Sequence, residues 1–135
     1  MTETWDVIIV GAGSAGLPAS IFAANRGASV LQIESSDKIG GTLYLSSGQI
    51  SAAGTQRQKA MGIEDSAAEH YDDAQRIAEN TIDPVLGKIA IDQAGETYDW
   101  LESIGYEPIE NHPISGGFHE PYTKRRYHWA ENAAI

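Results

Sequence analysis

The alternation of apolar and polar positions divides the first quarter of the chain into a strand, a helix and a second strand. The runs Asp6-Val7-Ile8-Ile9-Val10 and Ser29-Val30-Leu31-Gln32-Ile33 are apolar and of strand length, and a helix-compatible segment lies between them. This order predicts a β–α–β unit over residues 1–34, with Glu34 at the end of the second strand.

Two further helices are indicated by helical spacing and by the residues that begin them. Ser66-Ala67-Ala68-Glu69 reads as a capping box, in which the Ser66 hydroxyl accepts from the Glu69 amide and the Glu69 side chain reaches back to the Ser66 amide. We expect that helix to run to about Glu79. Asp83-Pro84 provides a cap and a first-turn proline for the next helix, which ends at Gly105. Its core-facing stripe consists of Ile91, Ala94, Tyr98 and Leu101.

The remaining segments lack a clear period. Residues 36–54 are rich in glycine and serine, which fits either a flexible surface loop or an ordered loop that wraps a cofactor; the interleaved Leu43, Leu45 and Ile50 favour the ordered loop. The pair Asp72-Asp73 indicates a solvated helix face rather than a metal site, because no second ligand cluster is visible. No third parallel strand is readable after Glu34.

Two strands alone would leave sheet edges unpaired and an apolar sheet face uncovered. We therefore expect the chain to be one piece of a larger protein, in which a second polypeptide or the remaining chain completes the domain.

Composition narrows the possible partners. The 135 residues fit one ordinary domain, and 9 Lys+Arg against 19 Asp+Glu give a formal charge of −10. This charge argues against nucleic acid or an anionic membrane as a partner. The chain has no cysteine, which excludes disulfides and suits a cytoplasmic protein. No apolar run reaches the roughly 20 residues that a membrane helix needs, and the first strand leaves no room for a signal peptide.

The candidate chemistry lies at the turn after the first strand, which reads G-x-G-x-x-G. Gly11 permits the tight turn, Gly13 lets the backbone approach a pyrophosphate, and Gly16 lets the helix pack on the strand. The N-terminal amides of that helix then face the phosphates. Glu34 follows about 20 residues on, where an acidic residue binds the ribose hydroxyls of a dinucleotide. A glutamate there favours an unphosphorylated ribose and argues against NADP.

A cluster of basic and aromatic residues lies near the C-terminal end. It contains His112, His119, His128, Lys124, Arg125, Arg126, Tyr122, Tyr127 and Trp129. Anion or substrate recognition, packing against other chain, and a solvated turn all fit this composition. The histidine spacing and the lack of cysteine argue against zinc. Because the tail has little chain of its own to pack against, we expect it to contact the completing polypeptide and substrate.

Three motifs in order resemble the fumarate reductase/succinate dehydrogenase flavoprotein superfamily, within it the soluble branch of flavocytochrome-type fumarate reductases, urocanate reductases and ketosteroid dehydrogenases. The first extends the glycine turn to G-x-G-x-x-G-x3-A-x3-A-x2-G-x2-V-x3-E, with Ser20 in place of the first alanine. The second covers residues 40–55 and is similar to the family's G-G-N-S/A-x-x-S/A-x-G-G-x-N-A-A-x-T loop. The third is Gln58-Lys59 followed by Gly62-Ile63-Glu64-Asp65-Ser66.

The resemblance implies FAD, with the glycine turn on the pyrophosphate, Glu34 on the adenosine ribose and the second loop beside the flavin. Thr42 stands where soluble members often have asparagine, and Gln49 replaces the second glycine of the family's G-G pair. Neither Thr42 nor Leu43 can carry the flavin covalently, as a histidine does in membrane-bound succinate dehydrogenases, so the FAD is expected to be non-covalent. The implied cofactor residues are Gly11, Ala12, Gly13, Ser14, Ala15, Gly16, Glu34, Ser35, Gly40, Gly41, Thr42, Leu43, Ser46, Ser47, Gly48 and Gln49.

The resemblance also implies a Rossmann-like α/β fold with four parts and a class of reaction. The parts are a dinucleotide unit (1–34), a flavin-contacting loop (35–64), helices (65–106) and a basic-aromatic tail (107–135). The reaction is the oxidation or reduction of a C–C bond next to a carbonyl or carboxylate of a small molecule, by hydride transfer at flavin N5. The family's catalytic residues lie largely beyond residue 135, so none is predicted here. A non-catalytic dinucleotide-binding module and a flavoprotein acting on an alcohol or amine are the alternatives.

Overall fold

The computed structural model describes residues 3–116 and 122–130. The chain divides into two compact units, residues 1–47 and residues 48–135, and each is described by itself. Within the described ranges, no helix combines the length and the apolar character needed to cross a bilayer.

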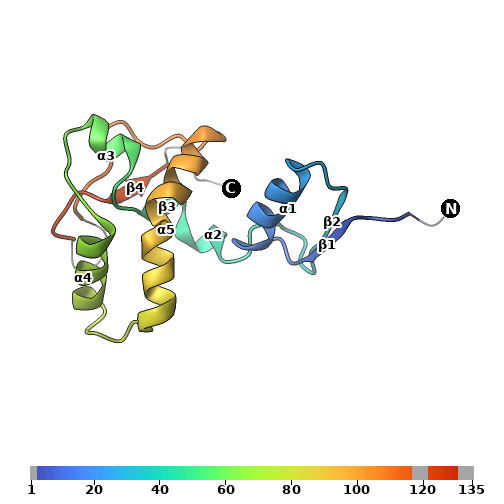
Figure 1. Cartoon of the computed structure of the whole chain (residues 1–135), viewed down its shortest axis with the longest axis horizontal. Helices are drawn as coiled ribbons and strands as arrows, with labels where there is room; N and C mark the ends of the chain where they lie inside the picture. The colour runs from blue at the N-terminus through green and yellow to red at the C-terminus, as the bar shows by residue number, and fades with distance from the viewer. Residues whose placement is uncertain (1–2, 117–121, 131–135) are drawn as a thin grey trace. The chain divides into compact units, whose positions relative to one another are not determined.

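The first unit is a parallel strand pair joined by a helix (Figure 1). β1 (Val7–Val10) pairs with β2 (Val30–Ile33), with Val7 opposite Val30 and Val10 opposite Ile33. α1 (Gly16–Ala24) connects the two strands and packs on them, and the short α2 (Leu43–Ser46) follows. The predicted β–α–β unit and the α/β fold class are confirmed.

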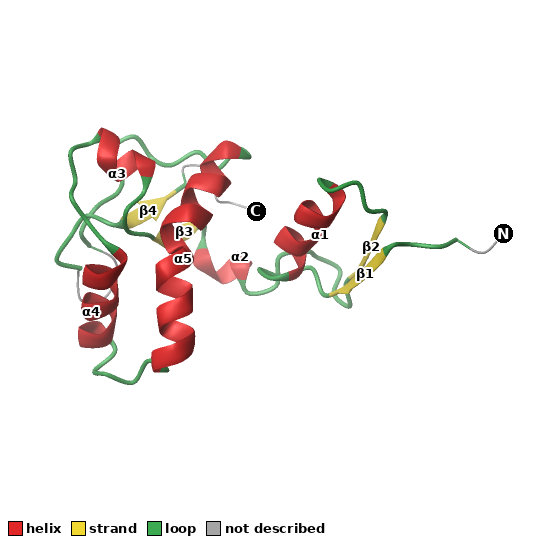
Figure 2. Ribbon diagram, in the orientation of Figure 1, coloured by secondary structure: helices red, strands yellow, loops and turns green. Residues whose placement is uncertain are grey.

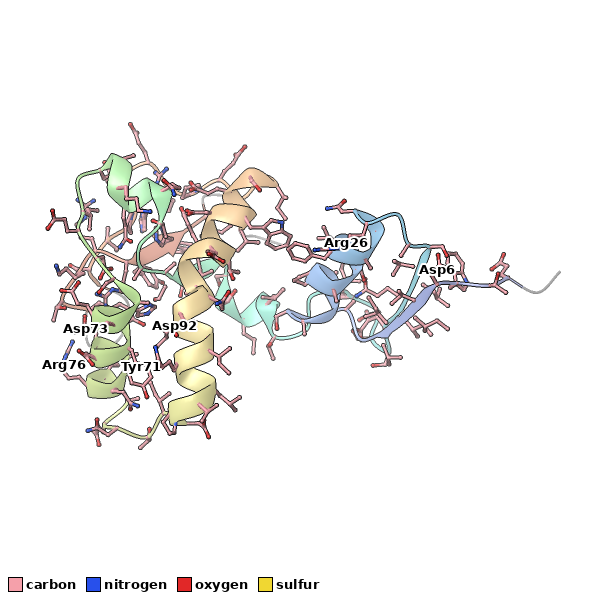
Figure 3. All side chains as sticks on the ribbon, in the orientation of Figure 1. Asp6, Arg26, Tyr71, Asp73, Arg76 and Asp92 are labelled. Atoms are coloured by element: carbon pink, nitrogen blue, oxygen red, sulfur yellow. The ribbon has the colours of Figure 1, made fainter. Side chains whose placement is uncertain are left out.

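Asp6 fixes the beginnings of these strands to each other (Figure 3). Its Oδ2 accepts from the Ser29 amide at 2.8 Å and from the Ser29 hydroxyl at 2.7 Å. The hydroxyl bond first, and then the backbone bond, lower the pKa of the Asp6 carboxyl. A carboxylate at the start of one strand therefore helps to set the register of the pair.

One face of the β1–β2 sheet is apolar and open to solvent. Ile8 and Val10 of β1 are 59% and 83% exposed, and Ile33 of β2 is 46% exposed. Val7 and Ile9, which alternate with them, are half-buried. Parallel sheets in α/β proteins normally have both faces covered, so this open face departs from the usual pattern.

The second unit packs three helices around a short antiparallel strand pair (Figure 2). Its elements in chain order are β3 (Gln49–Ser51), α3 (Gln56–Ala60), α4 (Ala67–Ile77), α5 (Pro84–Ser103) and β4 (Tyr127–Trp129). In the strand pair, Ile50 lies opposite His128. α4 packs against α5, whose predicted stripe is confirmed: Tyr98 is fully buried and the other three residues are half-buried.

Residues 35–64, predicted as a flavin-contacting loop, contain α2, β3 and α3. α3 begins with a complete capping box, because the Thr55 hydroxyl accepts from the Gln58 amide at 3.0 Å and the Gln58 side chain accepts from the Thr55 amide at 3.2 Å. Both side chains are buried. β3 is a strand only through its pairing with β4, which is remote in sequence. Local periodicity therefore gave no signal for it.

The beginning of α4 confirms half of the predicted capping box. The Ser66 hydroxyl accepts from the Glu69 amide at 3.2 Å. The Ser66 amide, however, donates to Oδ1 of Asp65 at 2.9 Å, so the predicted return bond from Glu69 is wrong. Asp65 directly precedes Ser66, and its carboxylate takes the place at the Ser66 amide that was predicted for Glu69.

The predicted solvated face of Asp72-Asp73 is correct for Asp72 and wrong for Asp73. Asp73, on α4 (Figure 3), is 5% exposed, and its Oδ2 accepts from Nη1 of Arg126 at 2.8 Å. Burial raises the pKa of Asp73, but hydrogen bonds from Thr123 and Arg76 and the charge of Arg126 outweigh it and hold that pKa below its usual value. The carboxylate is thus a buried anion that is paired within the unit.

The contacts of Arg126 also correct the expected role of the tail. Its Nε and Nη2 donate to the two carboxylate oxygens of Asp65 at 2.9 and 2.6 Å, and both side chains are 0% exposed. The arginine therefore joins the tail to the start of α4 inside this chain. The expectation that the tail has too little chain to pack against is wrong. His119, in the same predicted cluster, lies outside the described residues.

Candidate cofactor-binding site

The turn between β1 and α1 is shaped by a left-handed glycine. Gly11 has φ +99°, and its amide donates to the Ile33 carbonyl at 2.7 Å, which ties the turn to the end of β2. α1 then begins with Ala15 as N-cap, without a side-chain cap and without an acidic residue in its first turn. Such a helix start presents backbone amides and a positive dipole end to an anion.

The three glycines of the motif differ in what an added side chain would meet. A Cβ at Gly16 would lie 1.9 Å from the Gly11 carbonyl oxygen, which confirms the close helix–strand packing predicted there. A Cβ at Gly13 would meet nothing within 4 Å. Gly13 therefore faces open space, which suits the close approach of a ligand to the backbone.

Glu34 lies beside this turn as a hydrogen-bonded carboxylate. Its Oε2 accepts from the Ala12 amide at 2.7 Å, and its Oε1 accepts from the amides of Ser35 and Ser36 at 2.7 and 2.9 Å. These amides, with that of Ala12 as the largest cause, lower the pKa of Glu34 to about 2. The carboxylate is ionised at neutral pH, and Oε2 keeps acceptor capacity for a hydroxyl donor, since each carboxylate oxygen carries two lone pairs.

The second predicted loop packs back onto the glycine turn within the same unit. The buried Gly40 donates its amide to the Ala12 carbonyl at 2.7 Å. A Cβ at Gly41 would lie 3.6 Å from the Cα of Gly13. The structure thus brings Ala12, Gly13, Glu34, Ser35, Gly40 and Gly41 together around one turn.

The rest of the second loop divides between the two units. Thr42 is the exposed N-cap of α2, and the Ser46 hydroxyl donates to the Leu43 carbonyl at 2.8 Å. Ser47 ends α2 in the left-handed conformation. Gly48 and Gln49 begin the second unit, where the Gly48 carbonyl accepts from the Tyr106 hydroxyl at 2.7 Å and Gln49 pairs with Trp129.

Gln32 is a contributor to this site that the sequence interpretation missed. Its Nε2 donates to the Gly11 carbonyl at 3.1 Å, so a strand side chain supports the glycine turn. The signal was present as a polar residue in the middle of an apolar strand run. Ser20 bonds within α1, where its hydroxyl donates to the Gly16 carbonyl at 3.0 Å.

The basic and aromatic residues of the tail do not form a free anion site among the described residues. Arg125 donates its Nε to the Pro113 carbonyl at 2.9 Å, and Arg57 of α3 donates its Nε to the His112 carbonyl at 2.7 Å. His128 is fully buried, and burial is the main cause that lowers its pKa to about 4, so its ring is neutral at pH 7. These side chains hold the second unit together.

Comparison with known proteins gives matches over most of the chain. Residues 6–131 match the FAD binding domain family. The fumarate reductase (cytochrome) of Shewanella frigidimarina is 38% identical over 103 residues, which are 76% of this chain and 18% of that protein. The urocanate reductase of Eggerthella lenta is 32% identical over 113 residues, 82% of this chain and 19% of that protein.

A solved structure extends the likeness to the fold. The open conformation of a flavocytochrome c3 fumarate reductase superimposes with a TM-score of 0.76 and 34% identity, covering 97% of this chain and 22% of that one. The chain therefore spans about a fifth of the length of the curated relatives that it matches.

Proposed function

The chain belongs to the FAD-binding domain family of the fumarate reductase/succinate dehydrogenase flavoproteins, and from this premise we propose that it holds FAD non-covalently. The amides of Gly11 to Gly16 bind the pyrophosphate, and Glu34 binds the adenosine ribose. Residues 40–49 lie beside the flavin. The hydroxyl and alkyl side chains of Thr42 and Leu43 are not flavin-attaching groups, which supports non-covalent binding.

The observation that carries this proposal is the junction of the glycine turn with Glu34. A carboxylate held ionised at 2.7 Å from the Ala12 amide lies next to an open approach at Gly13. A ribose hydroxyl can donate to that carboxylate while the adjacent phosphate accepts from the start of α1. These residues bind and orient the cofactor.

We propose further that the complete protein is an FAD-dependent oxidoreductase acting on a C–C bond next to a carbonyl or carboxylate. Relatives named fumarate reductase and urocanate reductase support this class of reaction. Bound FAD supplies hydride exchange at N5, and further chain or a second polypeptide supplies the proton-transferring residue. The open apolar face of β1 and β2 supports the presence of such additional structure.

Replacing Glu34 by alanine is expected to weaken FAD binding roughly 10- to 100-fold, because hydrogen bonds to a charged acceptor are lost. The measurement is the dissociation constant of FAD, obtained by calorimetric titration of the chain. Asp37→Ala is the matched control, because Asp37 is an exposed acid in the adjoining turn and its removal changes the net charge equally.

Equal FAD affinity in the Glu34→Ala variant and the wild type would contradict the assigned role of Glu34. A loss of the same size in Asp37→Ala would assign the effect to net charge instead. Acid precipitation of the FAD-bound protein should release all of the flavin, and flavin retained in the pellet would contradict non-covalent binding.

A further inference from the structure

The position of Tyr106 is set by the C-terminal end of α5. The Tyr106 amide donates to the Leu101 carbonyl at 2.9 Å, and the Gly105 amide donates to the Glu102 carbonyl at 3.2 Å. With Gly105 at φ +112°, these two bonds form a Schellman motif, a common way to end a helix. The cap therefore fixes the backbone of Tyr106 at the end of α5.

The ring of Tyr106 is held by a row of aromatic side chains. It packs edge-to-face on Tyr98 of α5, with centroids 5.7 Å apart. Tyr98 in turn stacks on His128 of β4 at 3.8 Å between centroids. Tyr98 and His128 are both 0% exposed, so the row is anchored in the core of the second unit.

The hydroxyl of Tyr106 reaches the turn that precedes β3. It donates to the Gly48 carbonyl at 2.7 Å, across 58 residues of sequence. Ser47 and Gly48 have φ +49° and +70°, so two successive left-handed residues bend the chain here. Burial, as the largest cause, raises the pKa of Tyr106 to about 12, so the hydroxyl stays a donor at working pH.

β3, which follows this turn, is fixed by hydrogen bonds to β4 and to the residue before it. The Ala52 amide donates to the Arg126 carbonyl at 2.9 Å, and β3 pairs with β4 from Gln49 to Ser51. The turn at Gly48 is thus held between this pairing and the Tyr106 hydroxyl. A change at either anchor would free the backbone of Gly48 and Gln49.

We propose that Tyr106 is a positioning residue for the flavin, because it fixes the Gly48 carbonyl and with it the backbone of Gly48 and Gln49 on the flavin side of the cofactor. This inference rests on the proposed FAD site. Tyr106 does not itself contact the cofactor; it acts through the loop.

The test compares two tyrosine-to-phenylalanine variants of the whole chain that differ in one respect. Tyr106→Phe removes the hydroxyl bound to Gly48, whereas Tyr98→Phe removes a buried hydroxyl of the same aromatic row that is not bonded to the Gly48 turn. We expect Tyr106→Phe to weaken FAD binding about 3- to 10-fold and to shift the visible absorption of bound FAD. Without FAD, amide hydrogen exchange at Gly48 and Gln49 should accelerate in Tyr106→Phe. Tyr98→Phe should leave all three unchanged.

Unchanged FAD affinity, spectrum and exchange in Tyr106→Phe would overturn the inference. Equal effects in Tyr98→Phe would also overturn it, because they would show a general packing role for the aromatic row. If the wild-type chain binds no FAD, the proposed function fails instead. The exchange comparison without FAD then still decides whether Tyr106 holds the loop.

Discussion

Replacing Arg126 by alanine is expected to lower the free energy of unfolding by about 3–5 kcal/mol, because it removes the cation paired with the buried Asp65 carboxylate and one of the two cations paired with Asp73. Arg126 binds both oxygens of Asp65 and one oxygen of Asp73, and the three side chains are 0%, 0% and 6% exposed. Denaturant unfolding followed by circular dichroism measures the change.

Two comparisons separate the buried pairing from a general effect of charge. Lys88→Ala removes a cation from an exposed pair with Asp92 on α5, whose side chains are 63% and 39% exposed, and should cost no more than about 0.5 kcal/mol. Combining Arg126→Met with Asp65→Asn and Asp73→Asn should recover part of the loss, because no buried carboxylate is then left without Arg126. A cost for Arg126→Ala as small as that for Lys88→Ala would contradict the assigned burial.

Replacing Gly16 by alanine should disrupt the first unit and reduce FAD affinity more than 10-fold. The new Cβ would lie 1.9 Å from the Gly11 carbonyl oxygen, a backbone atom that cannot move without opening the β1–α1 turn. Overpacking of this kind costs about 1–3 kcal/mol, and here it falls on the backbone that we propose to bind the pyrophosphate. Thermal unfolding and FAD titration measure the two effects.

Gly13→Ala is the matched control, because it adds the same methyl group at a position where there is room for it. Its Cβ would meet nothing within 4 Å, so thermal unfolding should stay close to that of the wild type. FAD affinity should still fall, because the methyl group occupies the open approach to the backbone. If Gly16→Ala is as stable as the wild type, the close packing is wrong. If Gly13→Ala binds FAD normally, the phosphates do not approach at Gly13.

Local patterns predicted the parts of the fold that depend on neighbouring residues. The two apolar runs, the glycine turn and the Asp83-Pro84 start gave β1, α1, β2 and α5, and the order strand–helix–parallel strand is confirmed. β3 and β4 escaped prediction because each is a three-residue strand defined by a partner far along the chain. Periodicity over so few residues carries no signal.

Pairings across long sequence separations also explain the errors. Asp73 lies among polar residues on its helix and reads as solvated, but Arg126, 53 residues away, covers it. Asp65 and Arg126 are 61 residues apart and neither carries a local mark of burial. At the candidate site, the glycine spacing predicted the tight contact at Gly16, whereas the support from Gln32 depends on the strand pairing and was visible only as a polar residue in an apolar run.

Calorimetric titration of the chain with FAD, FMN and NAD tests the central claim most directly. We predict saturable binding of FAD, weaker binding of NAD, and no measurable binding of FMN. FAD and NAD share the adenosine diphosphate that the glycine turn and Glu34 would hold, and FMN lacks it. NAD carries no flavin, so it lacks the contacts that we propose for residues 40–49. Binding of FMN as tight as that of FAD, preference for NAD, or no binding of FAD would contradict the proposed site.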